Sequence, residues 1–351
     1  MPKYLVRLKP LDSFFFSGRE TFMSFETDTK EKTKYLVKSE YFPQQTTLLG
    51  VVRKQLLIVN NLYEENRENY GTDKYKLNKI INLIGNGSFQ IMSTENRESF
   101  GIIKEISPLF FYNNGNYYMI GAFDMNLKFQ ISNEGRVYTN GIKRNFIPEL
   151  NGYDSKKGYK KKIIPCNPYN EKSLYDYEDI FERDERIGIN INSKEKGYYK
   201  QIYYNLKDNF EFSFTLELKN EITEFNNYRT SIYMGAESRP FEMKVEKMED
   251  NNKIFDYNVG EKRIVCIGDA IFPDDNEFNK IREKSLFILG ETLYFRNYVY
   301  QYKGRSSKKN NSAYLLKRGS IIYVEDENNK KEIKQIIEKK NFKIIGYNHI
   351  L

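Results

Sequence analysis

The residues with the clearest chemical potential lie in two segments near the N-terminus. Ser17-Gly18-Arg19 forms a turn after an apolar strand, and Pro43-Gln44-Gln45-Thr46-Thr47 opens a helix that runs through Arg53. A guanidinium fork and the N–H groups at a helix start both bind anions. The pattern therefore predicts an anion site in which Arg19 lies close to the Thr46–Thr47 helix start. In a basic chain, the simplest ligand for such a site is a nucleic-acid phosphate.

Three further turns combine glycine with Arg or Lys. They are Met234-Gly235-Ala236-Glu237-Ser238-Arg239, Lys303-Gly304-Arg305 and Lys317-Arg318-Gly319-Ser320. Glycine lets backbone N–H groups approach a phosphate closely, and the neighbouring cation supplies charge. One such turn is typical of an ordinary hairpin, but four turns among strands indicate a binding surface.

Tyrosine pairs and a lysine run admit two interpretations each. Tyr198-Tyr199 and Tyr203-Tyr204 could stack on bases or pack across strands of a sheet. The run Lys156–Lys162 contains five lysines, which belong to a solvated loop or add a salt-sensitive attraction for nucleic acid.

Candidate catalytic groups are few. His349 is the one histidine in the chain and lies near its C-terminal end, where packing is the simpler role for it. Asp274-Asp275 could hold a metal, but Asp275 or Asn276 capping a helix is the simpler interpretation. No P-loop, dinucleotide fingerprint or HExxH motif is present. The residues therefore offer few candidates for a catalytic site, and we expect no metal or cofactor.

Composition limits the class of protein and its location. The 351 residues carry a net charge of +8, and 15% of them are aromatic, which is enough to build packed cores. Cys166 and Cys266 are too few for a disulfide framework or a zinc ribbon. Neither a signal peptide nor an apolar run of membrane-spanning length occurs. We therefore expect a cytoplasmic protein that does not contact a membrane.

Periodicity and turn residues predict strands separated by helices. Helices are expected from Thr46 or Thr47 through Leu57 and over residues 73–84, 278–289 and 330–340. Strands are expected at 4–16, 107–122 around an Asn-Gly turn, 186–206 as two strands around a polar turn near Lys194–Gly197, 210–218, 292–302, 317–325 and 342–351. Residues 26–40 are expected to form a loop, and residues 124–180 an inserted basic arm. The order predicts an α+β fold with antiparallel sheets.

The motifs, taken in order, resemble those of the RAMP superfamily of CRISPR–Cas proteins. The chain is similar to the third subunit of the type III-B (Cmr) effector complex, which binds the 5′ tag of the guide RNA. The resemblance rests on PLDSFFFSGRETF, FPQQTTLLGVVRKQLL with Pro43, Gly50 and Arg53, RIGININSKEKGYYKQIYY, MGAESRPF, KRGSIIYVE and Gly346-Tyr347-Asn348. Ala236 and Ser238 depart from the Gly-Gly-Glu-Arg-Arg pattern of the fourth motif, which leaves Arg239 as its remaining charge.

The resemblance implies two ferredoxin-like (RRM-like) domains, 1–207 with the basic insertion at about 124–180, and 208–351. It implies a non-catalytic subunit that binds CRISPR (guide) RNA, docks a large polymerase-like subunit and backbone RAMP subunits, and meets target RNA indirectly. Tag phosphates would contact Ser17, Gly18, Arg19, Gln45, Thr46, Thr47 and Arg53. The opposite wall would consist of Gly235, Arg239, Lys317, Arg318 and Gly319.

Three alternatives remain open at this point. A RAMP endoribonuclease that processes guide precursors could use Lys, Tyr or Ser in place of histidine. The equivalent subunit of the type III-A complex would share the fold and the role. A generic basic interaction protein would bind any RNA alike.

Overall fold

The structure is a computed structural model of the 351-residue chain. It describes residues 1–16, 20–23, 34–65, 74–85, 87, 89–91, 99–131, 137–139, 142–144, 153–154, 156, 158–167, 174–190, 197–207, 209–235, 237–249, 254–257, 259–295, 298–299, 308–309, 313–338 and 340–351. Helices alternate with groups of mainly antiparallel strands, so the predicted α+β class is confirmed. Within these residues, no helix is long and apolar enough to cross a membrane.

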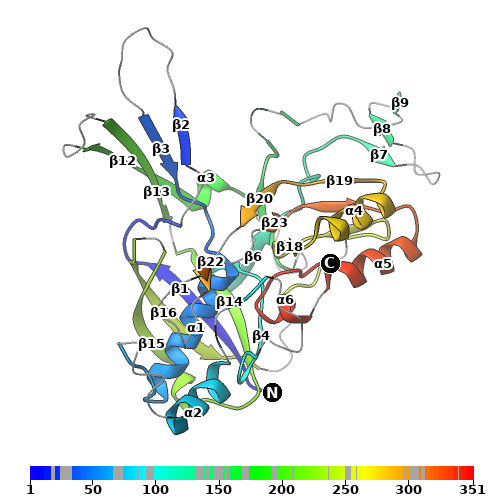
Figure 1. Ribbon diagram of the computed structural model, residues 1–351. Helices are drawn as coiled ribbons and strands as arrows, with labels where there is room; N and C mark the ends of the chain where they lie inside the picture. The colour runs from blue at the N-terminus through cyan, green and yellow to red at the C-terminus, as the bar shows by residue number, and fades with distance from the viewer. Residues whose placement is uncertain are drawn as a thin grey trace.

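The largest sheet has nine strands and is antiparallel (Figure 1). In spatial order its strands are β11 (Tyr175–Asp176), β10 (Lys162–Pro165), β6 (Asn116–Ile120), β5 (Phe110–Asn113), β14 (Glu211–Leu218), β1 (Lys3–Pro10), β16 (Arg239–Lys247) and β15 (Tyr228–Met234). The ninth strand, β4 (Ile103–Ile106), pairs with β14.

The main core lies between one face of this sheet and helix α1 (Gln45–Val59). The predicted strand over residues 210–218 is confirmed as β14; Phe212 and Leu216 are completely buried in the core, and the intervening Ser213 and Thr215 are buried as well. Leu48 and Leu56 of α1 are also completely buried and join the same cluster. The helix thus buries the apolar stripe that its sequence spacing predicts.

Glycine and asparagine end two elements as predicted. Asn114 and Gly115 have φ angles of +47° and +88° and form the tight turn between β5 and β6. Helix α2 (Lys74–Ile84) ends directly before Gly85, whose φ is +88°.

A second sheet of four strands projects from the nine-stranded sheet at the upper left of Figure 1. Its strands are β12 (Phe181–Asn190), β13 (Gly197–Leu206), β3 (Lys34–Lys38) and β2 (Glu20–Met23), and helix α3 (Tyr177–Ile180) precedes β12. The predicted loop over residues 26–40 is wrong at its end. Residues 35–37 are a short apolar run, Tyr-Leu-Val, and residues 35–38 pair with β13 in parallel.

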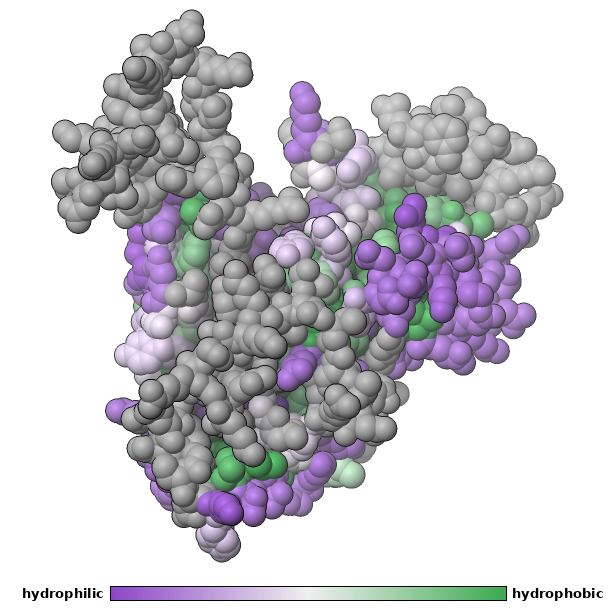
Figure 2. Space-filling model, in the orientation of Figure 1, coloured by the Kyte–Doolittle hydropathy of each residue, from purple (hydrophilic) through white to green (hydrophobic). Residues whose placement is uncertain are grey.

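The C-terminal part forms a separate group of two small sheets and two flanking helices. One sheet contains β17 (Arg263–Val265), β24 (Ile321–Tyr323) and β19 (Phe287–Leu289), and the other contains β18 (Ala270–Phe272), β23 (Ala313–Leu316) and β20 (Thr292–Phe295). Helices α4 (Asp275–Lys284) and α5 (Glu327–Ile337) bury Ile281 and Ile333 in a second core. Figure 2 shows that the outer surface over these helices is hydrophilic.

Shorter elements complete the described chain. They are β7 (Gln130–Ile131), β8 (Val137–Thr139) and β9 (Ile142–Arg144) in one sheet, β21 (Tyr298–Val299) with β22 (Lys308–Lys309), a 3₁₀ turn at Thr223–Phe225, and helix α6 (Lys340–Ile344).

Two predicted elements near the C-terminus are wrong. The helix predicted over residues 278–289 ends at Lys284, and the apolar residues 287–289 instead pair with β24. The cap of this helix is Asp274, whose Oδ1 accepts the Asn276 N–H at 2.9 Å, and not Asp275 or Asn276.

The predicted last strand over residues 342–351 is a short helix followed by a turn. Gly346 and Asn348 have φ angles of +90° and +57°, which a strand does not accommodate. The Asn348 side chain instead accepts the Ile271 N–H at 2.7 Å. Only Ile350 reaches a strand-like contact, an isolated bridge to Cys266.

The segment 124–180 is not wholly a separate arm. Residues 162–165 form β10, which pairs with β6 inside the nine-stranded sheet. The Phe123 and Tyr159 rings stack with centroids 4.8 Å apart, so the second half of the segment packs on the body. Lys157, one of the five lysines of the basic run, lies outside the described residues.

The predicted boundary between residues 207 and 208 falls within one sheet. β14 follows this boundary, yet it pairs with β1 and β5, which precede it. Among the described residues, the ladders of the nine-stranded sheet end at β16, and those of the C-terminal sheets begin at β17. The division into domains 1–207 and 208–351 stays a prediction. The nine-stranded sheet contains strands from both sides of this boundary.

Candidate nucleic-acid interface

The start of helix α1 is closed by the C-terminal segment. Gln44 is the N-cap residue, and no side chain caps the helix, so capping by Thr46 or Thr47 is wrong. The Tyr347 hydroxyl donates to Gln44 Oε1 at 3.1 Å. Burial raises the pKa of Tyr347, whereas hydrogen bonds from Thr46 lower it. A tyrosine hydroxyl thus already uses part of the hydrogen-bonding capacity of the predicted anion site.

Gln45 and Arg53 hold backbone segments in place. Gln45 is completely buried, and its amide in the satisfied orientation donates to the Ile345 carbonyl at 3.1 Å and accepts the Leu109 N–H at 3.0 Å. The Arg53 guanidinium donates to the Gly87 carbonyl at 2.5 Å. Both residues therefore connect α1 to neighbouring segments.

Arg318 lies inside the protein. It is 5% exposed, and its Nε and Nη2 donate to the Asp269 carboxylate at 3.2 and 2.9 Å. Burial alone would raise the pKa of Asp269, but the Arg318 guanidinium holds it below its usual value. The Arg318 Cζ also lies 4.9 Å from the centre of the Phe42 ring. This guanidinium is therefore a buried partner of Asp269. It is not exposed on the predicted RNA-binding wall.

Gly319 shapes the turn that carries Lys317. Its φ is +86°, and a Cβ there would lie 2.5 Å from the Phe123 ring. Its N–H donates to the Cys266 carbonyl at 2.7 Å. The glycine therefore permits a close backbone approach that a residue with a Cβ would not allow.

Lys161, Arg183, Lys317 and Glu40 lie near Lys38, and we name Lys38, Lys161, Arg183 and Lys317 the basic cluster. Burial and the charge of Arg183 lower the pKa of Lys38; Glu40 raises it, and Lys161 and Lys317 lower it further. Lys317 lies 3.3 Å from Glu40. Strand β3, the 159–162 segment, strand β12 and the turn before β24 thus converge in space.

The charges of the basic cluster are only partly balanced. Lys161 pairs with Glu291 at 2.5 Å, and Arg183 pairs with Glu185. Lys38 has no carboxylate partner among the described residues and lies 5.5 Å from the Tyr41 ring. Neighbouring cations destabilise the charged form of such a lysine. An added anion, such as a phosphate, would stabilise it.

A small cavity of about 50 Å³ opens beside the basic cluster. Lys161 and Lys317 of the cluster line it together with aromatic side chains and the buried ion pair, which include Tyr41, Phe42, Phe123, Tyr177, Asp269 and Arg318. The site therefore combines positive charge with aromatic surface, the pairing that single-stranded nucleic acid requires.

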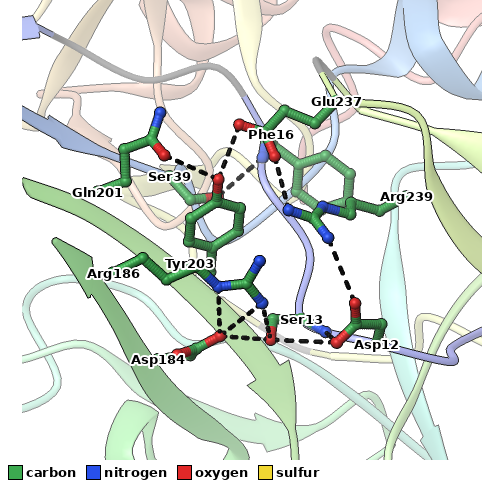
Figure 3. A network of polar contacts seen from close by, with 10 residues as sticks. All are labelled: Asp12, Ser13, Phe16, Ser39, Asp184, Arg186, Gln201, Tyr203, Glu237 and Arg239. Carbon is green, nitrogen blue, oxygen red and sulfur yellow. Dashed lines mark hydrogen bonds and ion pairs between the residues drawn. The ribbon is translucent and has the colours of Figure 1, made fainter. Parts of the chain in front are cut away.

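A second polar network surrounds Tyr203 (Figure 3). The guanidinium carbons of Arg186 and Arg239 lie 4.3 and 5.0 Å from the centre of the Tyr203 ring. Arg239 donates to Glu237 at 2.7 Å and to Asp12 at 3.3 Å. Arg239, which the sequence predicts as an RNA ligand, therefore already contacts two carboxylates.

Acidic partners also hold the other arginine of this network. Arg186 donates to Asp184 Oδ2 at 2.9 Å, and the Ser13 hydroxyl donates to the same oxygen at 2.6 Å (Figure 3). These contacts lower the pKa of Asp184, with the Ser13 hydrogen bond as the largest cause. Gly235, with a φ of +87°, begins the turn that carries Glu237 and Arg239.

The two clusters lie on opposite faces of the β12–β13 hairpin. Asp184 pairs in register with Tyr203, and the adjacent Arg183 pairs with Tyr204. Because successive strand residues point to opposite faces, Arg183 belongs with the basic cluster and Asp184 with the Tyr203 network. The structure thus does not combine Arg239 and Lys317 into one wall.

Sequence reasoning missed several residues of these clusters. Lys38 and Glu40 immediately precede the Pro43–Thr47 motif, yet they lie in what sequence analysis treats as a loop. Asp184 and Arg186 lie in a run of mixed charges, which is also typical of a solvent-exposed strand face. Ser17, Gly18 and Arg19 lie outside the described residues, so their place relative to α1 stays a prediction.

His349 packs inside the C-terminal segment. Burial lowers its pKa to about 4, and its Nε2 lies 3.0 Å from the Lys343 carbonyl. In the described part of the chain, no cluster of His, Cys, Asp or Glu could hold a metal ion.

The fold is similar to that of chains in solved structures of CRISPR complexes. A chain of the cryo-EM structure of the type III-B Cmr-beta complex bound to cognate target RNA has a TM-score of 0.52 and 17% identity, covering 99% of this chain and 96% of that one. The same complex with target RNA and AMPPnP gives a TM-score of 0.50, 16% identity and the same coverage. No curated protein matches the chain.

The fold is thus that of a chain in a type III-B CRISPR effector complex. A family model described as CRISPR-associated protein (Cas_Cmr3) matches residues 6–119 and 125–351. The chain belongs to this Cmr3 family of CRISPR-associated proteins. The resemblance found in the sequence motifs is confirmed, and the family assigns the chain to the type III-B effector subunits.

Proposed function

We propose that the chain is a non-catalytic subunit of a type III-B (Cmr) effector and that it holds the 5′ tag of the guide RNA at the basic cluster. The observation that carries the proposal is Lys38, which makes no ion pair with the described residues, has three other cations near it and lies 5.5 Å from Tyr41, one of the rings that line the cavity. Phosphates of a single strand would contact the cluster cations, and bases would contact the aromatic rings. The guide would in turn pair with target RNA.

The type III-B family supports further partners for the chain. In this proposal another face docks the large polymerase-like subunit, and the chain also contacts the backbone RAMP subunits of the complex. Pairing between guide and target then reads sequence, whereas this subunit reads the constant tag.

The proposal assigns no reaction to the chain. A general acid or base near neutral pH is usually a histidine with an accessible ring. His349 is instead buried, with a pKa of about 4, and its Nε2 is occupied by a carbonyl. Incubation with repeat-containing RNA should leave that RNA intact, and a discrete cut that a point mutation abolishes would identify an endoribonuclease instead.

Binding of tagged and tag-scrambled guides by the purified chain, across a salt series, tests the proposal. The wild type should prefer the true tag, and the preference should persist at higher salt. Equal binding that collapses with salt would contradict a tag-holding role and indicate general attraction to RNA.

A matched pair of variants tests the site. Lys38→Gln/Lys161→Gln/Lys317→Gln should flatten the slope of log affinity against log salt by about 2, since each phosphate contact to a single strand contributes about 0.7. The control Lys74→Gln/Lys280→Gln/Lys331→Gln removes the same charge from exposed helix positions. Equal slopes for the two variants would contradict the placement of the tag at the basic cluster.

A further inference from the structure

The four-stranded sheet meets the rest of the protein along a short line of backbone contacts. The Phe14 N–H donates to the Tyr204 carbonyl at 2.8 Å, and the Tyr204 N–H donates to the Phe14 carbonyl at 3.2 Å. A second isolated bridge joins Phe16 to Glu40. Contacts on either side of such a line fix the angle between the two parts that it joins.

The two sides of this line differ in chemistry. On the side of the basic cluster, the Tyr41 ring stacks on the Tyr204 ring, with centroids 4.4 Å apart. On the other face of the β12–β13 hairpin lies the Tyr203 network (Figure 3). We define this network as Tyr203 with the charged residues Asp12, Asp184, Arg186, Glu237 and Arg239.

The Tyr203 network crosses from the four-stranded sheet to the nine-stranded sheet. The Tyr203 hydroxyl of β13 donates to Glu237 Oε1, in the turn before β16, at 2.7 Å. The Ser13 hydroxyl, which follows β1, donates to Asp184 of β12 at 2.6 Å and accepts from Arg186 at 3.1 Å. Three hydrogen bonds therefore connect the projecting hairpin to two segments of the body.

The charges of this network do not favour a phosphate ligand. Its three carboxylates outnumber its two guanidiniums, and each guanidinium already pairs with at least one carboxylate. A phosphate placed here would therefore meet an excess of negative charge. The network also buries the Tyr203 ring, which is 2% exposed and leaves no face for a base.

The same sheet carries two cations of the basic cluster on its opposite face. Arg183 pairs in register with Tyr204, and Lys38 pairs in register with Ile202. Because side chains alternate between faces, these residues point away from the network around Tyr203. The other two cluster cations belong to the 159–162 segment and to the turn before β24. The angle of the sheet therefore sets the spacing between the two pairs of cations.

We propose that the Tyr203 network positions the basic cluster for RNA without touching the RNA. By fixing the angle of the four-stranded sheet, it holds Lys38 and Arg183 at the spacing from the other cluster cations that the tag phosphates require. The inference rests on the proposed function and assigns Tyr203, Asp184 and Glu237 as positioning residues. It has a distinctive consequence, because loss of acidic groups ordinarily strengthens the binding of RNA but here should weaken it.

The first test measures binding of the tagged guide by the full-length chain. Asp184→Asn/Glu237→Gln should bind more weakly than the wild type and lose the preference for the true tag. The slope of log affinity against log salt should flatten by about 1.4, since each of two displaced phosphate contacts contributes about 0.7. Tyr203→Phe removes one hydrogen bond across the junction and should shift binding in the same direction by a smaller amount.

A matched variant controls for charge. Glu283→Gln/Glu325→Gln removes the same charge from exposed positions outside the network and should bind the tagged guide at least as tightly as the wild type. Urea unfolding would confirm that each variant is folded under the binding conditions. Equal or tighter binding by the Asp184→Asn/Glu237→Gln variant would overturn the proposal.

The second test measures the angle of the sheet without RNA. Spin labels on Ile187→Cys of β12 and Ser231→Cys of β15 report the distance between the two sheets, and both positions are exposed. Cys166 and Cys266 are buried, so the labels should attach to the introduced thiols. The distribution of distances should be narrow in the wild type and broader with Asp184→Asn/Glu237→Gln. An unchanged distribution would overturn the proposal.

Failure of the proposed function would look different. The wild type would then show no preference for the true tag, or the triple glutamine variant of the basic cluster would match its control. The distances between the labels would still show whether the network sets the angle of the sheet. A broadened distribution together with a lost tag preference supports both proposals.

Discussion

The Lys317 ammonium lies 3.3 Å from the Glu40 carboxylate, although 277 positions separate the two residues in the sequence. Glu40 lies between β3 and α1, and Lys317 begins the turn that leads into β24. The ion pair therefore places the C-terminal glycine turn beside the segment that enters α1. This juxtaposition brings Lys317 near Lys38, Lys161 and Arg183, and Lys161 and Lys317 line one cavity.

Removing the acid from the basic cluster should strengthen RNA binding. Glu40→Gln releases Lys317 from its partner and removes a charge that repels phosphate. Since such a partly exposed ion pair is worth about 0.2–1 kcal/mol, affinity should rise by up to about fivefold. Filter binding at fixed salt measures the change, with Glu283→Gln on α4 as the control. Weaker binding by the Glu40 variant would place the RNA elsewhere.

Alkaline pH should release RNA through Lys38. Its pKa lies below the usual lysine value, so the ammonium loses its proton at a lower pH than an unperturbed lysine does. Phosphate binding favours the charged form, so affinity should fall as pH rises through this lowered pKa. Lys38→Arg stays charged and should retain affinity when measured on alkali-resistant 2′-O-methyl RNA. Parallel pH profiles for wild type and variant would contradict the assignment.

Mild acid should destabilise the protein through its one histidine. The folded pKa of His349 is about 4, against 6.5 for the unfolded chain, so the unfolded state binds the proton more readily. This contribution to stability is complete above pH 6.5 and is lost as pH falls toward about 4, amounting to about 3 kcal/mol.

A variant isolates that histidine from the carboxylates that titrate nearby. His349→Gln keeps an N–H donor for the Lys343 carbonyl but does not titrate. Its unfolding free energy should decline less between pH 6.5 and 4 than that of the wild type. Identical declines in urea titrations would show that folding does not lower the pKa of His349.

The buried pair of Arg318 and Asp269 should act on stability. Arg318→Met leaves a buried carboxylate without its partner and should cost about 3–5 kcal/mol of unfolding free energy. The double variant Arg318→Met/Asp269→Leu removes both charges and should recover most of the loss. Denaturant unfolding of the two variants measures this difference, and an unaffected single variant would contradict the role of Arg318 as a buried partner.

Local patterns in the sequence predicted much of the fold. The alternating residue types of β14, the apolar stripe of α1 and the Asn114-Gly115 turn each depend on neighbouring residues. The structure therefore contains these three elements where the sequence predicts them. Residues 287–289 and 342–351 failed because pairing with β24 and the positive φ of Asn348 are set by distant contacts.

The candidate site was predicted less completely than the fold. Lys317 was named from its glycine turn, but its neighbour Arg318 lies buried against Asp269, which no local pattern marks. Lys38 became a candidate only when Arg183 and Lys161 were brought beside it from distant segments. Such a cluster is a property of the tertiary fold, whereas the type of partner followed from charge and motif order.

Site-specific crosslinking of the guide tag tests the central claim most directly. A guide RNA with azidophenacyl groups on its tag phosphates would be irradiated with the protein, and the linked peptides identified by mass spectrometry. The account predicts crosslinks in the segments that carry Lys38, Lys161 and Lys317. Crosslinks confined to the outer surface of α4 and α5, with none at the basic cluster, would contradict it.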